Sequence, residues 1–294
     1  MNNAVFFRHS ASSLAAIPDL LAVRPFVPCG ATQRSSHGWV APRAEGGAIG
    51  EFVGGVLVLE FKIETKKLDA GQVRKLIDER CKLIEAECGC KPGRKAKADL
   101  KEEVEQSLLP AAPVKSRTIR VLMRPDGLMA ADVATLGKAD EMLTSMVQSI
   151  PDFRVISVRT LASPSATMAT WLNEGEATDG FVIGRHLGIK SEADSTQAAI
   201  KFKNCSLDTD EVKQYIRRGF VVQSMAVGLP KASFTLLDTG AIKGVLMEGE
   251  VAAATKEEKA DAFDADITLA AGTLFGDVFP ALMSALGGED PMTV

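Results

Sequence analysis

The sequence predicts an α+β fold in which antiparallel sheets are built from hairpins and covered by packed helices. Three observations lead to this fold class. Strand patterns occur in pairs joined by tight turns, two consecutive helical patterns form a basic segment, and the last apolar run repeats with a helical period. The chain has 294 residues, 46% hydrophobic and 24% charged, which is typical of globular proteins and excludes global disorder and a fibrous architecture.

Residues 1–65 are expected to form the N-terminal α/β part of a central domain. The apolar pattern predicts an opening strand at 3–8 and, after a Ser-rich N-cap, a short helix at 12–22 that Pro18 breaks. A polar loop follows. The next element is a single long strand at 52–63, which Gly54 and Gly55 weaken.

Residues 66–113 are expected to form a basic helical hairpin that projects from the sheet. The pattern at 71–87 predicts a helix with an apolar stripe made by Val73, Ile77, Cys81 and Ile84. A second helix is predicted at 97–109, with the stripe Leu100, Val104 and Leu108. Gly89, Pro92 and Gly93 mark the turn between the helices, and Pro110 ends the second one.

The second half of the chain repeats a hairpin followed by a helix. Residues 114–160 contain strands predicted at 118–123 and 128–133, joined by an Arg-Pro-Asp-Gly turn and followed by a helix at 138–150. A strand at 153–158 and a short helix at 167–173 come next, the latter within a mixed α/β segment at 161–230. Residues 231–294 form the second unit, with strands at 233–237 and 242–247 and a helix that begins near Lys256. The similarity hints at an internal duplication.

The apolar run at 267–288 is the only candidate for a membrane span. Its one charge is Asp277, and a carboxylate at the centre of a bilayer costs roughly 3 kcal/mol. Leu274, Val278, Leu282 and Leu286 recur every four residues, which favours an amphipathic core or subunit-interface helix and no membrane partner. The N-terminus lacks the basic region of a signal peptide, and five cysteines are too few for a disulfide scaffold, so we expect a cytoplasmic protein.

The charge is unevenly distributed along the chain. Residues 62–124 contain 16 basic and 10 acidic side chains, a net charge of +6, although the whole chain carries −4. The remainder therefore carries −10. On composition alone, such polarity favours a solvated helical segment whose charges pair four residues apart, and a polyanionic partner on one face is the alternative.

The sequence offers no catalytic constellation and no cofactor site. It has no glycine-rich phosphate loop and no nucleophile elbow, and its three histidines are scattered. Cys88 and Cys90 lack the second pair of ligands that a zinc site needs, so no metal is predicted. Asp264 and Asp266 favour an acid pair that complements the dipole at a helix start or caps the next element, and paired carboxylates of a divalent-metal-dependent nuclease or hydrolase are the alternative.

Several motifs resemble the RdgC family of recombination-associated proteins. They are Phe263-Asp264-Ala265-Asp266 with Leu282 and the closing Leu286-Gly287-Gly288-Glu289; Leu100-Lys101-Glu102-Glu103-Val104 with Ser107-Leu108-Leu109-Pro110; Phe26, Pro28-Cys29-Gly30 and Gly38-Trp39-Val40 with Pro42; and Trp171, Gly175 and Gly180-Phe181. The motifs occur in order over nearly the whole chain. The resemblance implies a ring-shaped homodimer that holds double-stranded DNA in a basic central hole, binds it with little sequence preference and restrains RecA-driven strand exchange without catalysis. It also implies a nucleoid-associated location and RecA as a further partner.

The basic positions of the family pattern can be carried over to this chain. Together with Lys67 of the basic segment, the expected DNA-binding residues are Arg74, Arg80, Lys91, Arg94, Lys97, Lys101, Lys203 and Lys243. The expected dimer contacts are Pro113, Lys203 and Asn204. Where the family has a basic residue and an aromatic after Ser-Leu-Leu-Pro, this chain has Ala111, Ala112 and Pro113, which predicts a weaker ring contact. A protein-interaction module whose basic hairpin docks an acidic partner is the third hypothesis.

Overall fold

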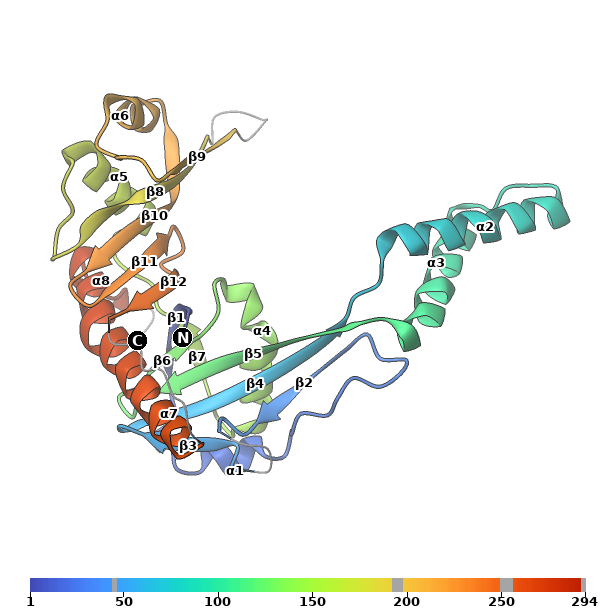
Figure 1. The fold of residues 1–294 in the computed structure, drawn as a ribbon, viewed down its shortest axis with the longest axis horizontal. Coiled ribbons are helices and arrows are strands. Elements are labelled where there is room, and N and C mark those ends of the chain that lie inside the picture. The colour runs from blue at the N-terminus through green and yellow to red at the C-terminus, as the bar shows by residue number, and fades with distance from the viewer. Residues whose placement is uncertain (44–46, 192–197, 249–255, 292–294) are drawn as a thin grey trace. The chain divides into compact units, whose positions relative to one another are not determined.

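The computed structural model describes residues 1–43, 47–191, 198–248 and 256–291 (Figure 1). The chain divides into two compact units. The sheet unit comprises Met1–Val23, Ala41–Glu60 and Ile119–Val294. The helix-pair unit comprises Arg24–Val40 and Phe61–Thr118. Each unit is described by itself.

A large antiparallel sheet with several helices makes up most of the protein. Its strands are β1 (Asn3–His9), β2 (Ser35–Val40), β3 (Gly50–Val53), β4 (Val56–Lys66), β5 (Val114–Met123), β6 (Leu128–Ala131), β7 (Val155–Ser157), β8 (Val182–Ser191), β9 (Ala199–Lys203), β10 (Phe220–Leu229), β11 (Ala232–Leu237) and β12 (Ile242–Met247). The described strands hydrogen bond in the order β2-β4-β5-β6-β1-β12-β11-β10-β8-β9, with β3 on β4 and β7 on β1. The predicted antiparallel hairpins β5–β6 and β11–β12 are confirmed, and they lie on either side of β1.

The sheet unit has six α-helices in its described residues. They are α1 (Ile17–Leu21), α4 (Asp140–Ser149), α5 (Pro164–Glu174), α6 (Asp210–Arg217), α7 (Lys256–Ala271) and α8 (Phe279–Ala285), with η2 (Leu136–Lys138) and η3 (Gly272–Val278). Phe6 of β1, Leu187 of β8 and Met225 of β10 lie in one buried cluster with α5 and the C-terminal helix. The rings of Phe6 and Phe279 are 5.1 Å apart. This core cluster therefore lies between the sheet and helices α5 to α8, whereas Ile17 of α1 and Met142 of α4 are buried outside it.

The C-terminal apolar run forms one continuous helix, as predicted. Helix α7 passes through the π-helical turn η3 into α8, and Ile267, Leu274, Phe275 and Leu282 of its apolar face are buried. By length and composition alone, the stretch Ala262–Ala285 is the one helix in the described residues that could cross a membrane. Of its most apolar part, 44% is buried inside the protein. Its apolar face packs against the core cluster, which agrees with the predicted core helix.

Two predicted elements near the N-terminus differ from the structure. Pro18 lies in the first turn of helix α1 rather than breaking it, because proline is tolerated there, where its missing N–H needs no partner. The long strand predicted at 52–63 is a hairpin of β3 and β4. Gly54 and Gly55 form its turn with φ of 57° and 83°, a left-handed conformation that glycine adopts without a steric penalty.

The region at 161–230, where one short helix was predicted, contains most of the elements that the sequence did not reveal. Strands β8, β9 and β10 and helix α6 lie there, and helix α5 is longer than the predicted 167–173. The β8–β10 pairing has two register shifts, so its strands do not keep a regular alternation of apolar and polar residues.

A buried histidine makes the stability of the sheet unit depend on pH. The Nε2–H of His9 donates to the carbonyl oxygen of Arg124 at 3.0 Å, and Nδ1 meets no partner in the described residues. The ring stacks on Phe153, with 6.1 Å between the centroids. Burial is the main cause that lowers the pKa of His9 below its ordinary value of 6.5. The unfolded chain therefore binds this proton more readily than the folded protein.

We expect the free energy of unfolding to fall as the pH drops below about 6.5 and to level off below the folded pKa. Urea unfolding between about pH 7.5 and 5.5 checks this. In a His9→Leu variant, the part of the pH dependence that belongs to the imidazole should be missing. Equal pH slopes for the two proteins would contradict the assignment.

Candidate nucleic-acid interface

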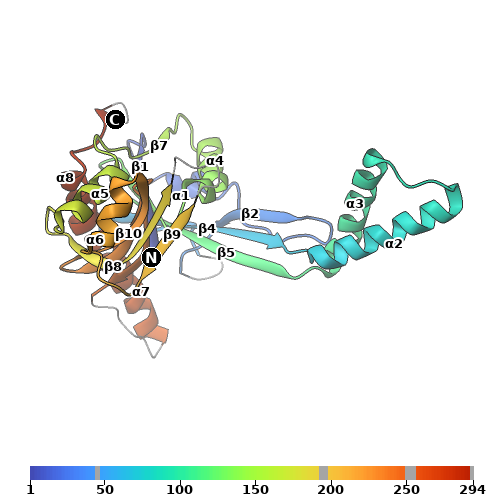
Figure 2. The same ribbon diagram turned by 90° about the horizontal axis from the view of Figure 1, so that it is seen from above.

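The helix-pair unit contains two consecutive helices with little core between them. Helices α2 (Ala70–Cys88) and α3 (Arg94–Leu108) are joined by a short loop and lie at a wide angle to one another, followed by η1 (Leu109–Ala111) (Figure 2). Asp69 caps α2 by accepting from the backbone N–H of Gly71 at 2.7 Å. Val73 and Val104 are the buried side chains of these helices within the described residues. Other apolar side chains of the predicted stripes, such as Ile77 and Leu100, are only half buried, so the two helices share a small core.

Three of the predicted DNA-binding residues of this unit are engaged in ion pairs. Arg80 contacts Glu103 of the facing helix at 2.6 Å, Lys91 contacts Glu85 at 4.0 Å, and Lys101 contacts Glu105 at 3.8 Å. The remaining four are exposed and form no ion pair within the described ranges: Lys67, Arg74, Arg94 and Lys97. Some charges of the basic segment are therefore paired, Lys101 with Glu105 four residues on, and others are exposed.

One lysine of the basic segment is a structural residue. Lys66 is 6% exposed, and its ammonium group donates to the carbonyl oxygens of Ala31 at 2.7 Å and Leu109 at 2.9 Å. A buried ammonium group held by backbone carbonyls links three segments of the helix-pair unit. The unit as a whole still carries 16 basic and 10 acidic side chains, or +6.

The sheet unit carries 18 basic and 28 acidic residues and is therefore acidic as a whole. Its charges are nevertheless unevenly distributed over the strands. Strands β8 to β12 contain no Asp or Glu and five Lys or Arg: Arg185, Lys190, Lys201, Lys203 and Lys243. The acidic residues of this unit lie outside these five strands, for example Asp210 and Glu211 on α6 and Asp264 and Asp266 on α7. We call the exposed face of these strands the acid-free face.

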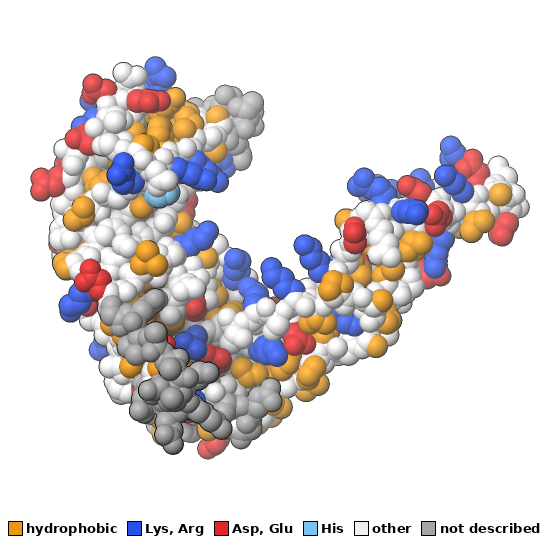
Figure 3. Space-filling model, viewed as in Figure 1, with side chains coloured by type: hydrophobic (Ala, Val, Ile, Leu, Met, Phe, Trp, Pro, Cys, Tyr) orange, Lys and Arg blue, Asp and Glu red, His pale blue; other side chains and the backbone are white. Residues whose placement is uncertain are grey.

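The strand register places the cations on the acid-free face. Leu187 and Ile189 point into the core, so their neighbours His186 and Gly188 point the other way. Lys203 pairs with His186, and Lys201 pairs with Gly188, which puts both lysines on that side. Across the sheet, Lys243 is exposed and pairs with Asn3 and Thr235. In Figure 3, Lys and Arg side chains gather beside a histidine below β9.

Small residues form the middle of this face. A Cβ on Gly188 would lie 2.6 Å from Ser224 Oγ, and a Cβ on Gly184 would lie 2.8 Å from the Ala226 carbonyl oxygen. Glycines opposite Ser224 and Ala226 keep the surface low between the cations of β9 and Lys243 of β12. A broad, rigid polyanion can therefore approach the backbone closely while lysines reach it from both sides.

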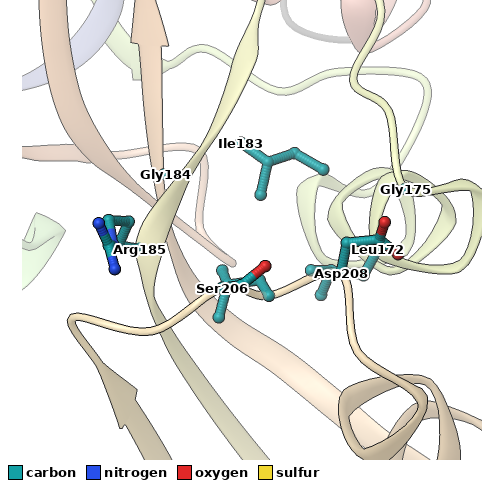
Figure 4. Close-up of a pocket in the computed structure, with 8 residues that line it drawn as sticks. Leu172, Gly175, Ile183, Gly184, Arg185, Ser206 and Asp208 are labelled. Atoms are coloured by element: carbon teal, nitrogen blue, oxygen red, sulfur yellow. The ribbon is translucent and has the colours of Figure 1, made fainter.

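Arg185 lies at the border of this face, beside a cavity of about 440 Å³ (Figure 4). Its guanidinium donates to the carbonyl oxygen of Asn204 at 3.2 Å. Arg185 and Asp208 lie on opposite sides of the cavity, and Asp208 pairs with Lys213 at 2.7 Å. Asp208, the one carboxylate among the described residues that line the cavity, is exposed and already paired with Lys213. These lining residues therefore offer no acid–base pair for catalysis. Arg185 extends the cationic surface toward β9.

The predicted dimer contacts lie at exposed positions. Lys203 ends the edge strand β9, and Asn204 follows it with a left-handed φ of 55°, which asparagine tolerates. Pro113 is exposed just before β5, and its carbonyl oxygen accepts from the N–H of Lys67 at 3.0 Å. The contacts themselves remain a prediction. Arg185 and Lys190 were not among the cations predicted from the sequence. The absence of acidic residues from strands β8 to β12 is the feature that would have indicated them.

The contacts of Asp264 and the position of Asp266 favour a structural role for this pair. Asp264 accepts from the guanidinium of Arg43 at 2.5 Å, and Arg43 also donates to Glu51 at 2.9 Å. Arg43 and Arg120 lie over the ring of Phe263, at 4.7 and 5.4 Å from its centroid. Asp266 lies two residues further along α7, where the helical period directs it to a different side. Within the described residues, no group of three His, Cys, Asp or Glu side chains is suited to hold a metal ion.

This arrangement predicts a small effect of Asp264→Asn. The carboxylate is half exposed, and such ion pairs contribute about 0.2–1 kcal/mol. We expect the free energy of unfolding to fall by no more than about 1 kcal/mol, as measured by urea titration. Loss of a Mg²⁺-dependent DNA cleavage activity in this variant would instead assign the carboxylate to a nuclease site.

The closing Leu-Gly-Gly-Glu motif also makes a structural contact. Glu289 accepts from two nitrogens of Arg8, including Nε at 3.0 Å, and the Arg8 guanidinium lies 5.7 Å from the centre of the Phe279 ring. The hydrogen bond with Glu289 is the main cause that raises the pKa of Arg8 above its usual range. Through Glu289, the motif therefore connects the C-terminal segment to Arg8 of β1.

Comparisons with known proteins identify the family of this chain. A family model described as "Putative exonuclease, RdgC" matches residues 1–289. Similar proteins named "Recombination-associated protein RdgC" occur in Dechloromonas aromatica, with 32% identity over 94% of this chain and 92% of the relative, and in Cupriavidus necator, with 33% identity over 92% and 91%. The protein of that name from Aeromonas hydrophila is 32% identical over 90% of this chain and 89% of its own. The chain belongs to the RdgC family of recombination-associated proteins.

Proposed function

We propose that this chain is a non-catalytic protein that binds double-stranded DNA without sequence preference, encircles it as a homodimer and restrains RecA-dependent homologous recombination. The acid-free face carries this proposal, because its five cations have no acidic neighbour on strands β8 to β12. Lys and Arg side chains that neutralise phosphates release counterions, which gives affinity without reading base edges. The membership in the RdgC family supports the link to recombination.

The helix-pair unit supplies further phosphate contacts in this proposal. Arg74, Arg94 and Lys97 are exposed and lack ion pairs in the described part of the chain, so each is free to contact a phosphate. Arg80 and its partner Glu103 already neutralise one another. We therefore expect Arg94 and Lys97 to contribute more to DNA affinity than Arg80, Lys91 and Lys101.

Two features of the isolated chain support a homodimer. Leu83 on α2 is 63% exposed, and several other apolar side chains of the helix pair are only half buried, so a second copy has apolar surface to cover. Strand β9 is an edge strand that ends in the predicted contacts Lys203 and Asn204, and an unpaired edge is a natural place for another chain. A ring closed through Lys203, Asn204 and Pro113 is the form that we propose, in the cytoplasm and on the nucleoid, with RecA as a further partner.

Binding to duplex DNA is tested by fluorescence anisotropy across a salt series. We expect two random duplexes of different composition to bind with similar affinity, and the log–log slope against salt to be about −5, from about 0.9 per phosphate and roughly six contacts. A flat dependence on salt, or no binding at low salt, would contradict the proposal. Incubation with Mg²⁺ and labelled DNA tests the nuclease alternative, which predicts degradation that Asp264→Asn abolishes.

The protein-interaction alternative requires a separate control. If the helix pair contacts phosphates, charge reversal at Arg94 and Lys97 should lower the affinity for duplex DNA below that of the wild type, measured over the same salt series. Unchanged DNA affinity of this variant would show that the helix pair docks something other than DNA. The effect on recombination is measured as slower RecA-driven strand exchange when the protein is present.

A further inference from the structure

A pair of thiols occupies the turn between α2 and α3. Cys88 and Cys90 are both exposed and free, and Gly89 alone separates them. Cys81 lies two turns earlier on α2 and is half buried. Cys88 lies seven positions after Cys81, so at about 1.5 Å of rise per residue the two are about 10 Å apart along the helix, which is too far for a disulfide. The turn therefore presents two accessible thiols that are near neighbours along the chain, with Cys81 out of reach of Cys88.

The backbone of the turn is shaped for closure between these thiols. Gly89 ends α2 in the left-handed conformation, with φ 71° and ψ 4°, and its N–H donates to the carbonyl oxygen of Glu85 at 2.9 Å. A residue with helical dihedral angles of either hand brings the Cα atoms on its two sides to about 5.5 Å, as in an α-helix. Disulfides span Cα distances of roughly 4.4–6.8 Å. The two Cα atoms are thus already within disulfide range.

We propose that Cys88 and Cys90 form a reversible disulfide that closes the turn of the helix pair, with a low-molecular-weight disulfide as the oxidant. The thiolate of one cysteine attacks a sulfur of the oxidant, forms a mixed disulfide and releases the first thiol. The second cysteine then attacks the protein sulfur of that bond and releases the second thiol. Two protein thiols are oxidised, and one disulfide is reduced to two thiols.

The surroundings favour an anionic oxidant such as glutathione disulfide. Arg94 and Lys97 at the start of α3 are exposed and free of ion pairs in the described residues, so the positive charge beside the turn attracts anions. Closure acts on a helix pair with a small core, in which Val73 and Val104 are buried. The disulfide restrains the turn that sets the spacing of the two helices.

The test uses the full chain in glutathione buffers of graded redox potential, followed by alkylation, proteolysis and mass spectrometry. The proposal expects the peptide that contains both cysteines to lose about 2 Da and to regain it with dithiothreitol. Cys81→Ser should close as the wild type does. Cys88→Ser should give only a glutathione adduct on Cys90. A mixed disulfide as the sole product of the wild type, a bond to Cys81, or a bond between two chains would overturn the proposal.

Substitutions of Gly89 test whether the left-handed turn prepares the closure. No atom lies within 4 Å of a Cβ built at this glycine, so a side chain acts only through its effect on φ. Gly89→Ala should lower the equilibrium constant for closure about fivefold or more, because alanine resists this conformation. Gly89→Asn should have a smaller effect, since asparagine visits it readily. Equal closure of the alanine variant and the wild type would contradict the role of the turn.

Discussion

Replacing Lys190, Lys201, Lys203 and Lys243 by glutamine should weaken binding to a random duplex about a thousandfold near 0.1 M salt. These lysines lie on strands without acidic residues, so each can neutralise a phosphate directly. Each lost contact removes about 0.9 from the log–log salt slope, and four contacts together change the slope by between about three and four. Fluorescence anisotropy over a salt series measures both quantities, and the far-ultraviolet circular dichroism spectrum should stay that of the wild type.

A matched variant separates this effect from a general loss of charge. Lys138, Arg154, Arg217 and Arg218 are exposed cations of the sheet unit outside strands β8 to β12, and their replacement by glutamine removes the same charge. We expect less than a tenfold loss of affinity, because these cations lie outside the acid-free face and lose no direct phosphate contact there. Equal losses in the two quadruple variants would show that the acid-free face is not the DNA-binding surface.

Leu282→Glu should lower the free energy of unfolding by about 3 kcal/mol or more. The Leu282 side chain is 2% exposed and lies in the core cluster with Phe6 and Leu286. The substitution buries a carboxylate without a partner and also removes an apolar side chain from the core. Urea unfolding measures the loss, and we expect much of the variant to be insoluble.

The control at this site is Leu282→Met. A volume-conserving apolar replacement in a packed core costs less than about 1.5 kcal/mol, so this variant should fold and remain close to the wild type. If Leu282→Glu melts at the wild-type temperature, the apolar face of α8 is not part of the core. The helix would then be free to serve as a subunit interface, the other role that its periodicity allows.

Local signals predicted most of the regular elements. The turn sequences with glycine predicted the hairpins β5–β6 and β11–β12. In the structure, Gly127 and Gly240 take left-handed φ values of 85° and 78° at these turns. Helical periodicity located α2, α3, α4 and the C-terminal helix to within a few residues. Strand β8 was missed because Gly184 and Gly188 interrupt its alternation, and glycine is depleted in strands.

The candidate interface was only partly predictable, because it depends on contacts between distant residues. Arg80 and Glu103 are 2.6 Å apart in the fold, yet nothing in the sequence pairs them. Lys66 counts as a cation in any sequence sum, but the structure buries it against backbone carbonyls. Strand register alone shows that Lys201, Lys203 and Lys243 share one face. Net charge concealed this face, whereas the distribution of acidic residues reveals it.

Encirclement of duplex DNA by a dimer is tested most directly by retention on a nicked circular plasmid. The protein is loaded at low salt, the sample is moved to about 0.5 M salt, and the DNA that stays bound is counted before and after linearisation. A closed ring predicts that protein persists on the circle at high salt and is lost once the DNA has ends. Equally fast loss from circular and linear DNA, or a monomer mass by light scattering of the bound species, would contradict encirclement.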